Sequence, residues 1–424
     1  MTGKRRTLGS WAALAVCLIA TNALGGEELR EAAKKPPKDP EAAFELGRSL
    51  RRAGEFDDAL RVLRGAALKA KGELAVRARL EAARTLISAN RQKDALRECQ
   101  GIKPLDAVKW DVCVAESHLL WKRASLALPA AERALEAAAG DYDALVAKGR
   151  ALRMMGKSAE SEAAFQSAIA KSAGRFQAHL YLAELYSGLG KQSDAVAALR
   201  KAVAADPDEP TPMLVLAEAL PASAEASDLL EKALKIRPKF GAALARKGEL
   251  LLEQGKVAEA EAAYRAAVAT DAKMADWQAG LARALVAKGT FDEALKVASV
   301  ALKLVSNHAL AKLAEADAIA GKGDIDLAIE AYEKAASFSR ENPWPLVNAA
   351  RACLGGNRPT TARAFADRAV QSFPEFAPAW LALGDVAVAG KDKSAAKNAY
   401  QKALTAPKGN VDKAAVKKKL AALK

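Results

Sequence analysis

The sequence has 424 residues, a formal net charge of +14 and only 5% aromatic residues, and alanine, leucine, lysine, arginine and glutamate dominate it. Such side chains lose little rotamer freedom on a helix, so the composition favours helix almost throughout. Of the charge, +3 lies in the KRR of residues 4–6 and +5 in residues 408–424, which leaves +6 elsewhere. This distribution argues against a nucleic-acid-binding protein, whose charge is normally concentrated on the folded body.

Residues 1–25 have the pattern of a secretory signal peptide. A basic KRR is followed by an apolar run over residues 8–20 and then by TNALGG, with small residues at the end. The run is shorter than the roughly 20 residues that span a bilayer. We therefore expect cleavage after Gly25 and a periplasmic or secreted mature chain.

Cys17 raises an alternative for the same segment. The sequence LAVC resembles the lipobox of bacterial lipoproteins, in which the cysteine is acylated, although Val16 stands where that pattern has a small residue. A lipidated Cys17 would make the chain a membrane-anchored lipoprotein. The other predicted contact with a membrane is through the basic C-terminal residues 408–424.

After a predicted linker at 26–39, small residues recur with a period of 34. One row in the second half of the chain is Ala226, Ala260, Ala294, Ala328, Ala362 and Ala396. A second row of small residues lies seven positions after most members of the first row. A third row lies twelve positions before the first row and includes Gly47, Gly149, Gly248 and Gly384. Apolar residues at three- and four-residue spacing between these rows indicate two amphipathic helices in each period.

These motifs resemble the tetratricopeptide repeat family. The Leu-Gly pair of that family's first helix is present at 46–47 and 383–384, and its Ala-x3-aromatic-x2-Ala motif at 260–267, 328–335 and 396–403. The resemblance implies an all-α, right-handed α-solenoid of about eleven helix-turn-helix repeats over residues 40–407. It also implies a protein-binding scaffold with no bond-making step. Each helix pair is too small to bury its own face and is stabilised by stacking on its neighbours.

Two segments depart from the regular repeat. Residues 209–238 are three residues short and contain Pro210, Pro212 and Pro221 besides the closing Pro238, which indicates either a hinge or a tolerated deletion. Residues 408–424 are predicted to form a basic cap helix, since polar caps are expected at the ends of solenoids. Contact between this lysine-rich tail and an anionic membrane or nucleic acid is the alternative.

The motifs of common enzymes are absent from the sequence. The three histidines are far apart, and there is no His-Glu-x-x-His pair, phosphate-binding loop or nucleophile elbow. We therefore expect no enzymatic activity, no cofactor and no metal site.

Three cysteines follow the predicted cleavage point. Cys353 falls on the buried side of a first helix and is interpreted as a core residue. Cys99 and Cys113 lie on neighbouring helices that should pack together, and disulfides persist in exported proteins. A Cys99–Cys113 disulfide is therefore a hypothesis.

The concave surface is the remaining candidate site. The family's groove-lining position falls on eleven charged residues: Arg48, Arg84, Glu116, Arg150, Glu184, Glu218, Glu249, Arg283, Asp317, Arg351 and Asp385. A neighbouring position adds Arg51 and Arg153. Because arginine forks suit carboxylates, the arginine-rich end is predicted to bind an acidic or carboxylate-bearing protein segment. Alternatively, charges on adjacent repeats pair with one another.

The sequence thus predicts a non-enzymatic interaction scaffold of the bacterial cell envelope. A lipid-anchored assembly factor for outer-membrane, pilus or polysaccharide-export machinery is the alternative. Polysaccharide binding would require aromatic platforms in the groove, for which Trp344 is the one prominent candidate.

Overall fold

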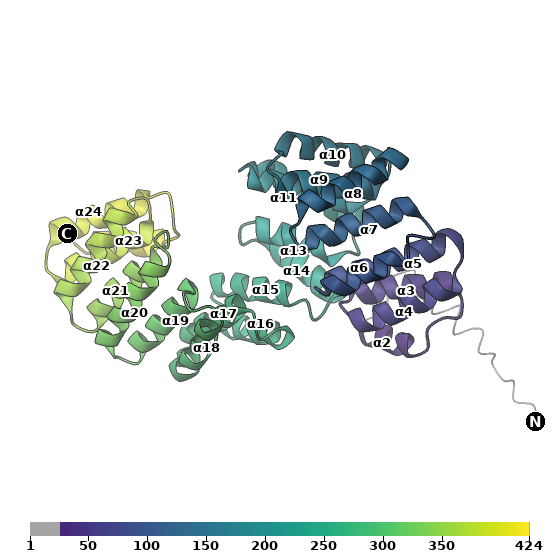
Figure 1. Cartoon of the computed structure of the whole chain (residues 1–424). Helices are drawn as coiled ribbons and strands as arrows, with labels where there is room; N and C mark the ends of the chain where they lie inside the picture. The colour runs from purple at the N-terminus through teal and green to yellow at the C-terminus, as the bar shows by residue number, and fades with distance from the viewer. Residues whose placement is uncertain (1–25, 424) are drawn as a thin grey trace, which may run out of the picture. The chain divides into compact units, whose positions relative to one another are not determined.

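The computed structural model describes residues 26–423, which are helical apart from turns and one isolated bridge between Phe376 and Lys408 (Figure 1). The predicted signal peptide, with Cys17, lies outside these residues. The contacts divide the chain into two compact units, Met1–Ala243 (unit 1) and Leu244–Lys424 (unit 2). Within the described part of the chain, no helix has both the length and the apolar character needed to cross a membrane.

Unit 1 contains thirteen described helices and the first residues of a further one. They are α2 (Gly26–Lys34), α3 (Pro40–Arg52), α4 (Phe56–Lys69), α5 (Gly72–Ser88), α6 (Gln92–Gln100), α7 (Ala107–Leu120), α8 (Ala124–Ala137), α9 (Tyr142–Met154), α10 (Ser158–Lys171), α11 (Phe176–Gly188), α12 (Gln192–Ala205), α13 (Pro210–Ala219) and α14 (Ala224–Ile236).

The remaining helices belong to unit 2, although α15 begins just before the division. They are α15 (Gly241–Glu253), α16 (Val257–Thr270), α17 (Ala275–Lys288), α18 (Phe291–Leu304), α19 (Ala309–Gly321), α20 (Ile325–Phe338), α21 (Trp344–Gly355), α22 (Pro359–Ser372), α23 (Ala377–Ala389), α24 (Lys393–Thr405) and α25 (Lys413–Ala421).

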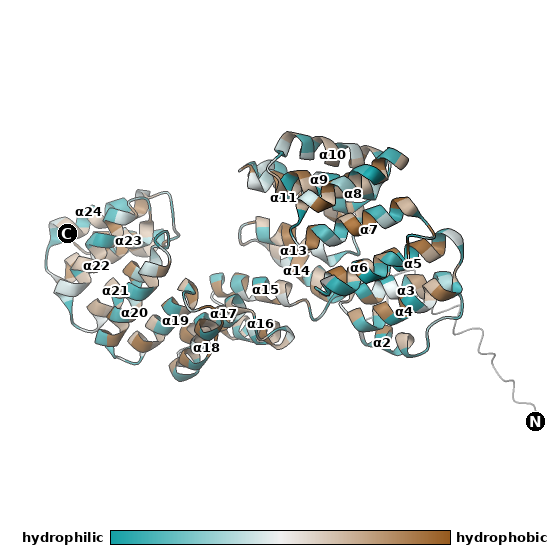
Figure 2. Cartoon of the chain, in the orientation of Figure 1, coloured by the Kyte–Doolittle hydropathy of each residue, from teal (hydrophilic) through white to brown (hydrophobic). Residues whose placement is uncertain are grey.

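Successive helices pack as antiparallel pairs, from α3 with α4 to α23 with α24. The described residues therefore contain eleven pairs, which confirms the predicted all-α solenoid of helix-turn-helix repeats. Individual helices carry both hydrophobic and hydrophilic residues (Figure 2), as amphipathic helices of a solenoid must.

The small residues of the first helix in each pair make room for a large residue of the second. A Cβ atom on Gly149 would lie 2.6 Å from Phe165 Cε1, and one on Gly384 would lie 2.4 Å from Tyr400 Cδ1. Both glycines precede their aromatic partner by 16 residues. This close approach explains why the sequence repeats small residues at a fixed period.

The turn within each pair, except that between α13 and α14, contains a residue in the left-handed region. Gly190 and Gly255 both have φ of 73° there, where a side chain would be strained. Asn357 takes the same role with φ of 57°, because asparagine tolerates this region better than most residues.

Residues 26–39 were expected to be a linker, but most of them form helix α2. Leu29 and Ala33 are four residues apart, lie on one face of α2 and are buried in the core shared with α3 and α4. The segment has too few hydrophobic residues to give a clear helical pattern in the sequence, and α2 covers the first helix pair.

The irregular segment 209–238 forms the short helix α13 and helix α14. Pro210 and Pro212 lie in the first turn of α13, where a missing backbone N–H costs no hydrogen bond. Pro221 follows the end of α13 and helps to stop it. The division between units 1 and 2 lies after this segment, at Ala243 and Leu244.

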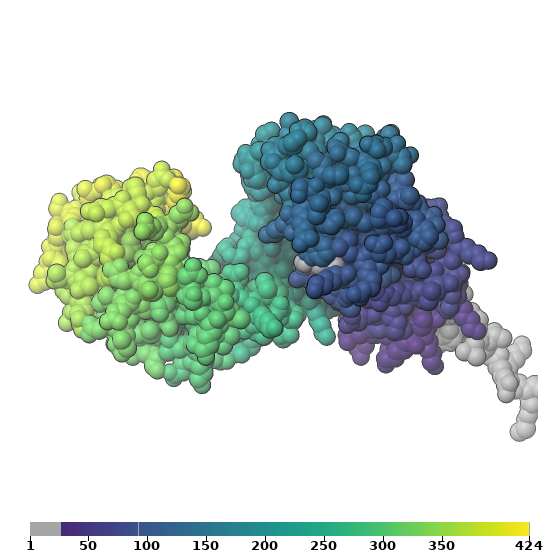
Figure 3. Space-filling view, in the orientation of Figure 1, coloured from purple at the N-terminus to yellow at the C-terminus, as the bar shows by residue number. Residues whose placement is uncertain are grey.

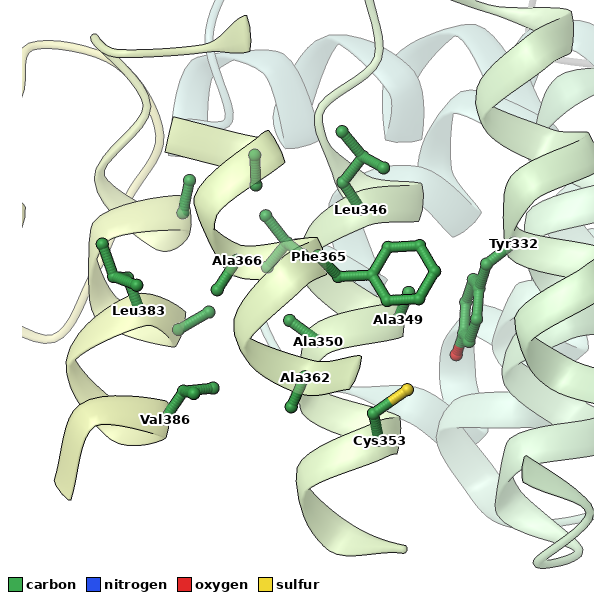
Figure 4. Close-up of a cluster of buried hydrophobic side chains, with 14 of the residues drawn as sticks. Tyr332, Leu346, Ala349, Ala350, Cys353, Ala362, Phe365, Ala366, Leu383 and Val386 are labelled. Atoms are coloured by element: carbon green, nitrogen blue, oxygen red, sulfur yellow. The ribbon is translucent and has the colours of Figure 1, made fainter. Parts of the chain in front are cut away.

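The core of unit 2 is built from alanines with occasional larger side chains. Figure 4 shows Phe365 of α22 pointing toward the ring of Tyr332 in α20, with Ala349 of α21 beside it. Cys353 is buried in the same cluster, and burial raises the pKa of its thiol. It therefore packs as a small hydrophobic residue.

Helix α25 covers the last helix pair. Asp412 caps its first turn, and Val416 is buried against Tyr400 and Ala403 of α24. Its lysines 413, 417 and 418 are exposed.

Candidate functional site

The first helices of the first five pairs, α3, α5, α7, α9 and α11, line a cavity of about 610 Å³, here called the unit 1 cavity. Eight of its lining side chains are cationic and five are acidic. The cations are Arg48, Arg51, Arg52, Arg77, Arg84, Lys109, Arg150 and Arg175, and the acids are Glu73, Glu81, Glu116, Asp143 and Asp206. Phe44, Phe176 and Tyr181 add aromatic surface.

Arg84 joins three consecutive repeats at the centre of this cavity. Its Nη2 atom lies 2.8 Å from Glu116 of α7 and 2.8 Å from Asp143 of α9. Asp143 also accepts from Arg175, at 2.5 Å, and from Lys109, at 3.4 Å. Burial opposes the charge on Asp143, but these three cations together hold its pKa well below the ordinary value.

Arg51 makes a similar bridge at the start of the unit. Its Nε atom donates to Glu81 at 2.6 Å, and its Nη2 atom lies 3.3 Å from Glu209. Burial would raise the pKa of Glu81, but the charges of Arg51, Arg84 and Arg48 lower it overall. Glu209 is only 1% exposed, so its carboxylate depends on Arg51 and on the Thr211 hydroxyl, which donates to it at 2.9 Å.

Contacts between residues far apart in the sequence hold the first and last helix pairs of unit 1 together beside the cavity. Arg52 pairs with Asp206 at 2.7 Å, and Arg237 Nε donates to the Arg52 carbonyl at 2.7 Å. The Arg237 guanidinium also lies 4.5 Å from the centre of the Phe240 ring. Burial lowers the pKa of Arg237 to about 10 although Glu209 favours its charge. The first helix pair is thus joined to the fifth and sixth.

Arg150 differs from its neighbours in the cavity. Among the described residues it has no ion pair, and its guanidinium lies over the Tyr181 ring, 4.3 Å from the centroid. The side-chain oxygen of Gln177, which also lines the cavity, is buried without a hydrogen-bond partner. The cavity therefore offers a ligand both an arginine fork and an acceptor for an N–H group.

The structure brings together four of the eight partner-binding residues predicted from the sequence. Arg48, Arg51, Arg84 and Arg150 all line the unit 1 cavity. The other four residues, Arg153, Glu184, Glu218 and Glu249, are not among the lining residues.

Arg153, Glu184 and Glu249 have other partners or lie in the other unit. Arg153 pairs with Glu184 at 2.7 Å, and burial raises the pKa of that carboxyl although Arg153 opposes the shift. Glu249 lies in unit 2, where it pairs with Arg246.

Several lining residues were missed, although the sequence contained a signal for them. Arg77, Lys109, Asp143 and Gln177 each precede a predicted groove position by seven residues. Seven residues are about two helical turns, so such residues lie on the same face. Arg175 precedes its helix and had no such signal.

In unit 2 two of the equivalent positions, Asp317 and Asp385, accept a hydrogen bond from a tyrosine of their own repeat. Tyr332 donates to Asp317 at 2.7 Å, and Tyr400 donates to Asp385 at 2.7 Å. Burial raises the pKa of Asp317 even though Tyr332 and Asn348 donate to it. These contacts connect the two helices of a repeat through a buried aromatic hydroxyl.

Cys99 of α6 and Cys113 of α7 are joined by a disulfide in the structure, with Cα atoms 5.6 Å apart. Both are fully buried beside Leu80 and Ile102. Among residues 26–423, no group of three or more His, Cys, Asp or Glu side chains is arranged to hold a metal ion.

Models of the tetratricopeptide repeat family match most of the chain. One matches residues 22–67, 44–107, 146–210 and 347–411, and a second matches 222–279 and 251–317. The chain belongs to the tetratricopeptide repeat family. Proteins with tetratricopeptide repeats generally mediate protein–protein interactions, and the fold is typically non-enzymatic.

Relatives of this tetratricopeptide repeat chain include human protein O-mannosyl-transferase TMTC3, which is 34% identical over 120 residues. The match covers 28% of this chain and only 13% of that protein. Yeast Tom70 aligns over 91% of this chain and 95% of its own, at 14% identity and a TM-score of 0.45. The APC/C hetero-tetramer Cut9–Hcn1 aligns over 98% and 96%, at 13% identity and a TM-score of 0.47.

Proposed function

We propose that this chain is an exported scaffold of the bacterial cell envelope, and that its unit 1 cavity binds an acidic or carboxylate-bearing segment of a partner protein. The observation that carries the binding proposal is Arg150, a cavity-lining guanidinium with no ion pair among the described residues. The export proposal rests on the signal-peptide pattern of residues 1–25.

An acidic peptide satisfies the groups that the unit 1 cavity leaves available. Its carboxylate can take both N–H groups of the Arg150 fork, and its backbone N–H can donate to the Gln177 oxygen. The lining cations exceed the acids by three, so the cavity attracts negative charge. Cavities of about 300–1,000 Å³ bind ligands of a few residues, which suits a short segment or a chain end.

Binding of a fluorescein-labelled peptide of eight glutamates to the chain from Gly26 to Lys424 tests this proposal. Arg150→Glu is expected to weaken binding at least tenfold, because it removes the fork and adds a repelling charge. Arg153→Glu is the matched control, since Arg153 lies one turn away in α9 and pairs with Glu184 outside the cavity. Equal affinities of the two variants would contradict a site at Arg150.

Photo-crosslinking in intact cells from position 150, followed by mass spectrometry, identifies the partner. Position 153 again serves as the control. Crosslinks to one envelope protein that are specific to position 150 would support the scaffold. Crosslinks only to cytoplasmic proteins would contradict the proposed location.

A lipid-anchored assembly factor is the alternative form of the same proposal. It requires acylation of Cys17, which then becomes the first residue of the mature protein. The intact mass of the protein purified from cell envelopes distinguishes the two forms. A start at Gly26 indicates signal-peptide cleavage, and a diacylglyceryl mass on Cys17 indicates the lipoprotein.

A further inference from the structure

The last two helices and the turns beside them carry most of the net charge of the chain. Residues 391–424 contain ten lysines, no arginine and two aspartates, which gives +8 of the total of +14. This segment includes α24 and α25, which lie at the surface of unit 2 (yellow in Figure 3). The concentration of a single cationic residue type sets it apart from the arginine-lined unit 1 cavity.

Neither aspartate of this segment neutralises a lysine. Asp392 accepts from the backbone N–H of Ala395, and Asp412 accepts from those of Ala414 and Ala415. Both carboxylates therefore cap helices. Their negative charge lies at helix N-termini, so it does not neutralise the positive charge of the lysines.

Six lysines of this segment are exposed and have no ion pair in the described structure. They are Lys391, Lys393, Lys397, Lys413, Lys417 and Lys418, here called the C-terminal lysine surface. Three others are engaged: Lys408 pairs with Glu375, Lys419 pairs with Asp385, and Lys402 lies over the Trp380 ring.

Helices α24 and α25, which carry most of the lysines of this surface, pack against each other. Val416 of α25 is 1% exposed and is buried with Tyr400 and Ala403 of α24, and Leu420 and Leu423 pack against the same cluster. Helices α24 and α25 therefore hold the C-terminal lysine surface together as part of the fold. A disordered basic tail would lack this arrangement.

We propose that the C-terminal lysine surface docks onto a membrane surface rich in anionic phospholipid. Clusters of four to eight basic residues bind anionic lipids through summed electrostatic attraction. Between residues 391 and 423 the structure exposes no large hydrophobic side chain, so the contact is peripheral and involves no insertion. This inference goes beyond the proposed function and does not rest on it.

The residue types favour a lipid surface over a nucleic acid or a specific acidic protein. Lysine is a flexible point charge that suits a diffuse negative surface, whereas arginine suits bidentate recognition. Proteins that bind single-stranded nucleic acid also offer aromatic rings for stacking. Here Tyr400 is 2% exposed, and Trp380 is covered by Lys402 and donates to the Pro374 carbonyl.

Vesicle co-sedimentation tests the proposal with the chain from Gly26 to Lys424, which contains every described helix. We expect binding to vesicles of 30% phosphatidylglycerol in phosphatidylcholine, none to pure phosphatidylcholine, and loss of binding in 0.5 M NaCl. The triple variant K413E/K417E/K418E is expected to bind more than tenfold more weakly, because each lysine near an anionic leaflet contributes about fivefold.

Two further variants keep the result interpretable. K69E/K235E/K239E changes the net charge equally at exposed lysines of unit 1 without ion pairs, and it is expected to retain binding. K391E/K393E/K397E alters the α24 side of the surface and is expected to lose binding, which keeps the test valid if the α25 variant unfolds. Equal binding by the lysine-surface variants and the control would overturn the proposal. Binding of DNA or polyphosphate without binding of anionic vesicles would also overturn it.

Discussion

Arg237 Nε donates a 2.7 Å hydrogen bond to the backbone carbonyl of Arg52, a residue that precedes it by 185 positions. The same guanidinium lies over the nearby Phe240 ring, and its hydrogen bond to Arg52 joins the sixth helix pair of unit 1 to the first. The unit 1 cavity is therefore bounded by a closed series of repeats. Its shape depends on this contact as well as on the stacking of neighbours.

Arg237→Ala is expected to loosen unit 1 at this junction. It removes a charge-assisted hydrogen bond and the stacking on Phe240, so the free energy of unfolding of unit 1 should fall by about 2 kcal/mol. Hydrogen exchange of residues 40–56 and 209–236 should rise before that of the other helices. Arg265→Ala, an exposed outer residue of unit 2, is the control. Unchanged exchange in residues 40–56 would contradict the closure.

The carboxylates of the unit 1 cavity should make its stability depend on pH. The pKa values of Asp143 and Glu81 lie below their ordinary values of 3.8 and 4.5, because neighbouring cations outweigh the effect of burial. A pKa that is lower in the folded state means that stabilisation is full above the unfolded value and is lost as the pH falls through the folded one. Unit 1 should therefore weaken below about pH 4.

Asp143→Asn checks the origin of this dependence. The variant should be less stable at pH 7, because Arg84 and Arg175 lose a charged partner, but its stability should change less between pH 5 and pH 2.5. Hydrogen exchange of α9 peptides measures both effects. Asp228→Asn, at an exposed pair on α14, should keep the full pH dependence of the parent. A full pH dependence in Asp143→Asn would assign it to other groups.

The bond between Cys99 and Cys113 should stabilise unit 1 in an oxidising compartment. The disulfide closes a loop of this size in the unfolded chain and so raises the free energy of the unfolded state by about 3 kcal/mol. The double variant Cys99→Ala with Cys113→Ala should therefore lower the free energy of unfolding by a similar amount. Urea unfolding with and without dithiothreitol measures this difference, and non-reducing peptide mapping detects the bond. In Cys353→Ala, dithiothreitol should have the same effect as in the parent. Two free thiols in protein from the oxidising compartment would refute the pairing.

Gly384→Ala should destabilise unit 2, because its Cβ would lie 2.4 Å from the Tyr400 ring. Overpacking of this kind costs about 1–3 kcal/mol. Gly65→Ala is the opposite case, since no atom lies within 4 Å of the added Cβ in α4. It should stabilise unit 1 by about 0.5–1 kcal/mol. Thermal unfolding of both variants tests whether the small residues of the first helices serve close packing.

Much of the fold was predictable because its determinants are local. The period of 34 and the alternation of small and large residues define helix pairs, as the contact between Gly149 and Phe165 shows. Each helix pair contacts mainly its neighbours, so the pattern that predicts one repeat also predicts the others. The exception was α2, whose few hydrophobic residues gave too weak a pattern.

The candidate site was predictable only in part. The sequence by itself determined which residues share a helix face, through helical periodicity. Its resemblance to the tetratricopeptide repeat family implied that Arg84 and Arg150 lie on the groove-lining face. Only the tertiary structure decided that Arg84 is held by Glu116 and Asp143 while Arg150 lies over Tyr181. It also decided the closure through Arg237, because that contact depends on small rotations accumulated over six helix pairs, which no single repeat specifies.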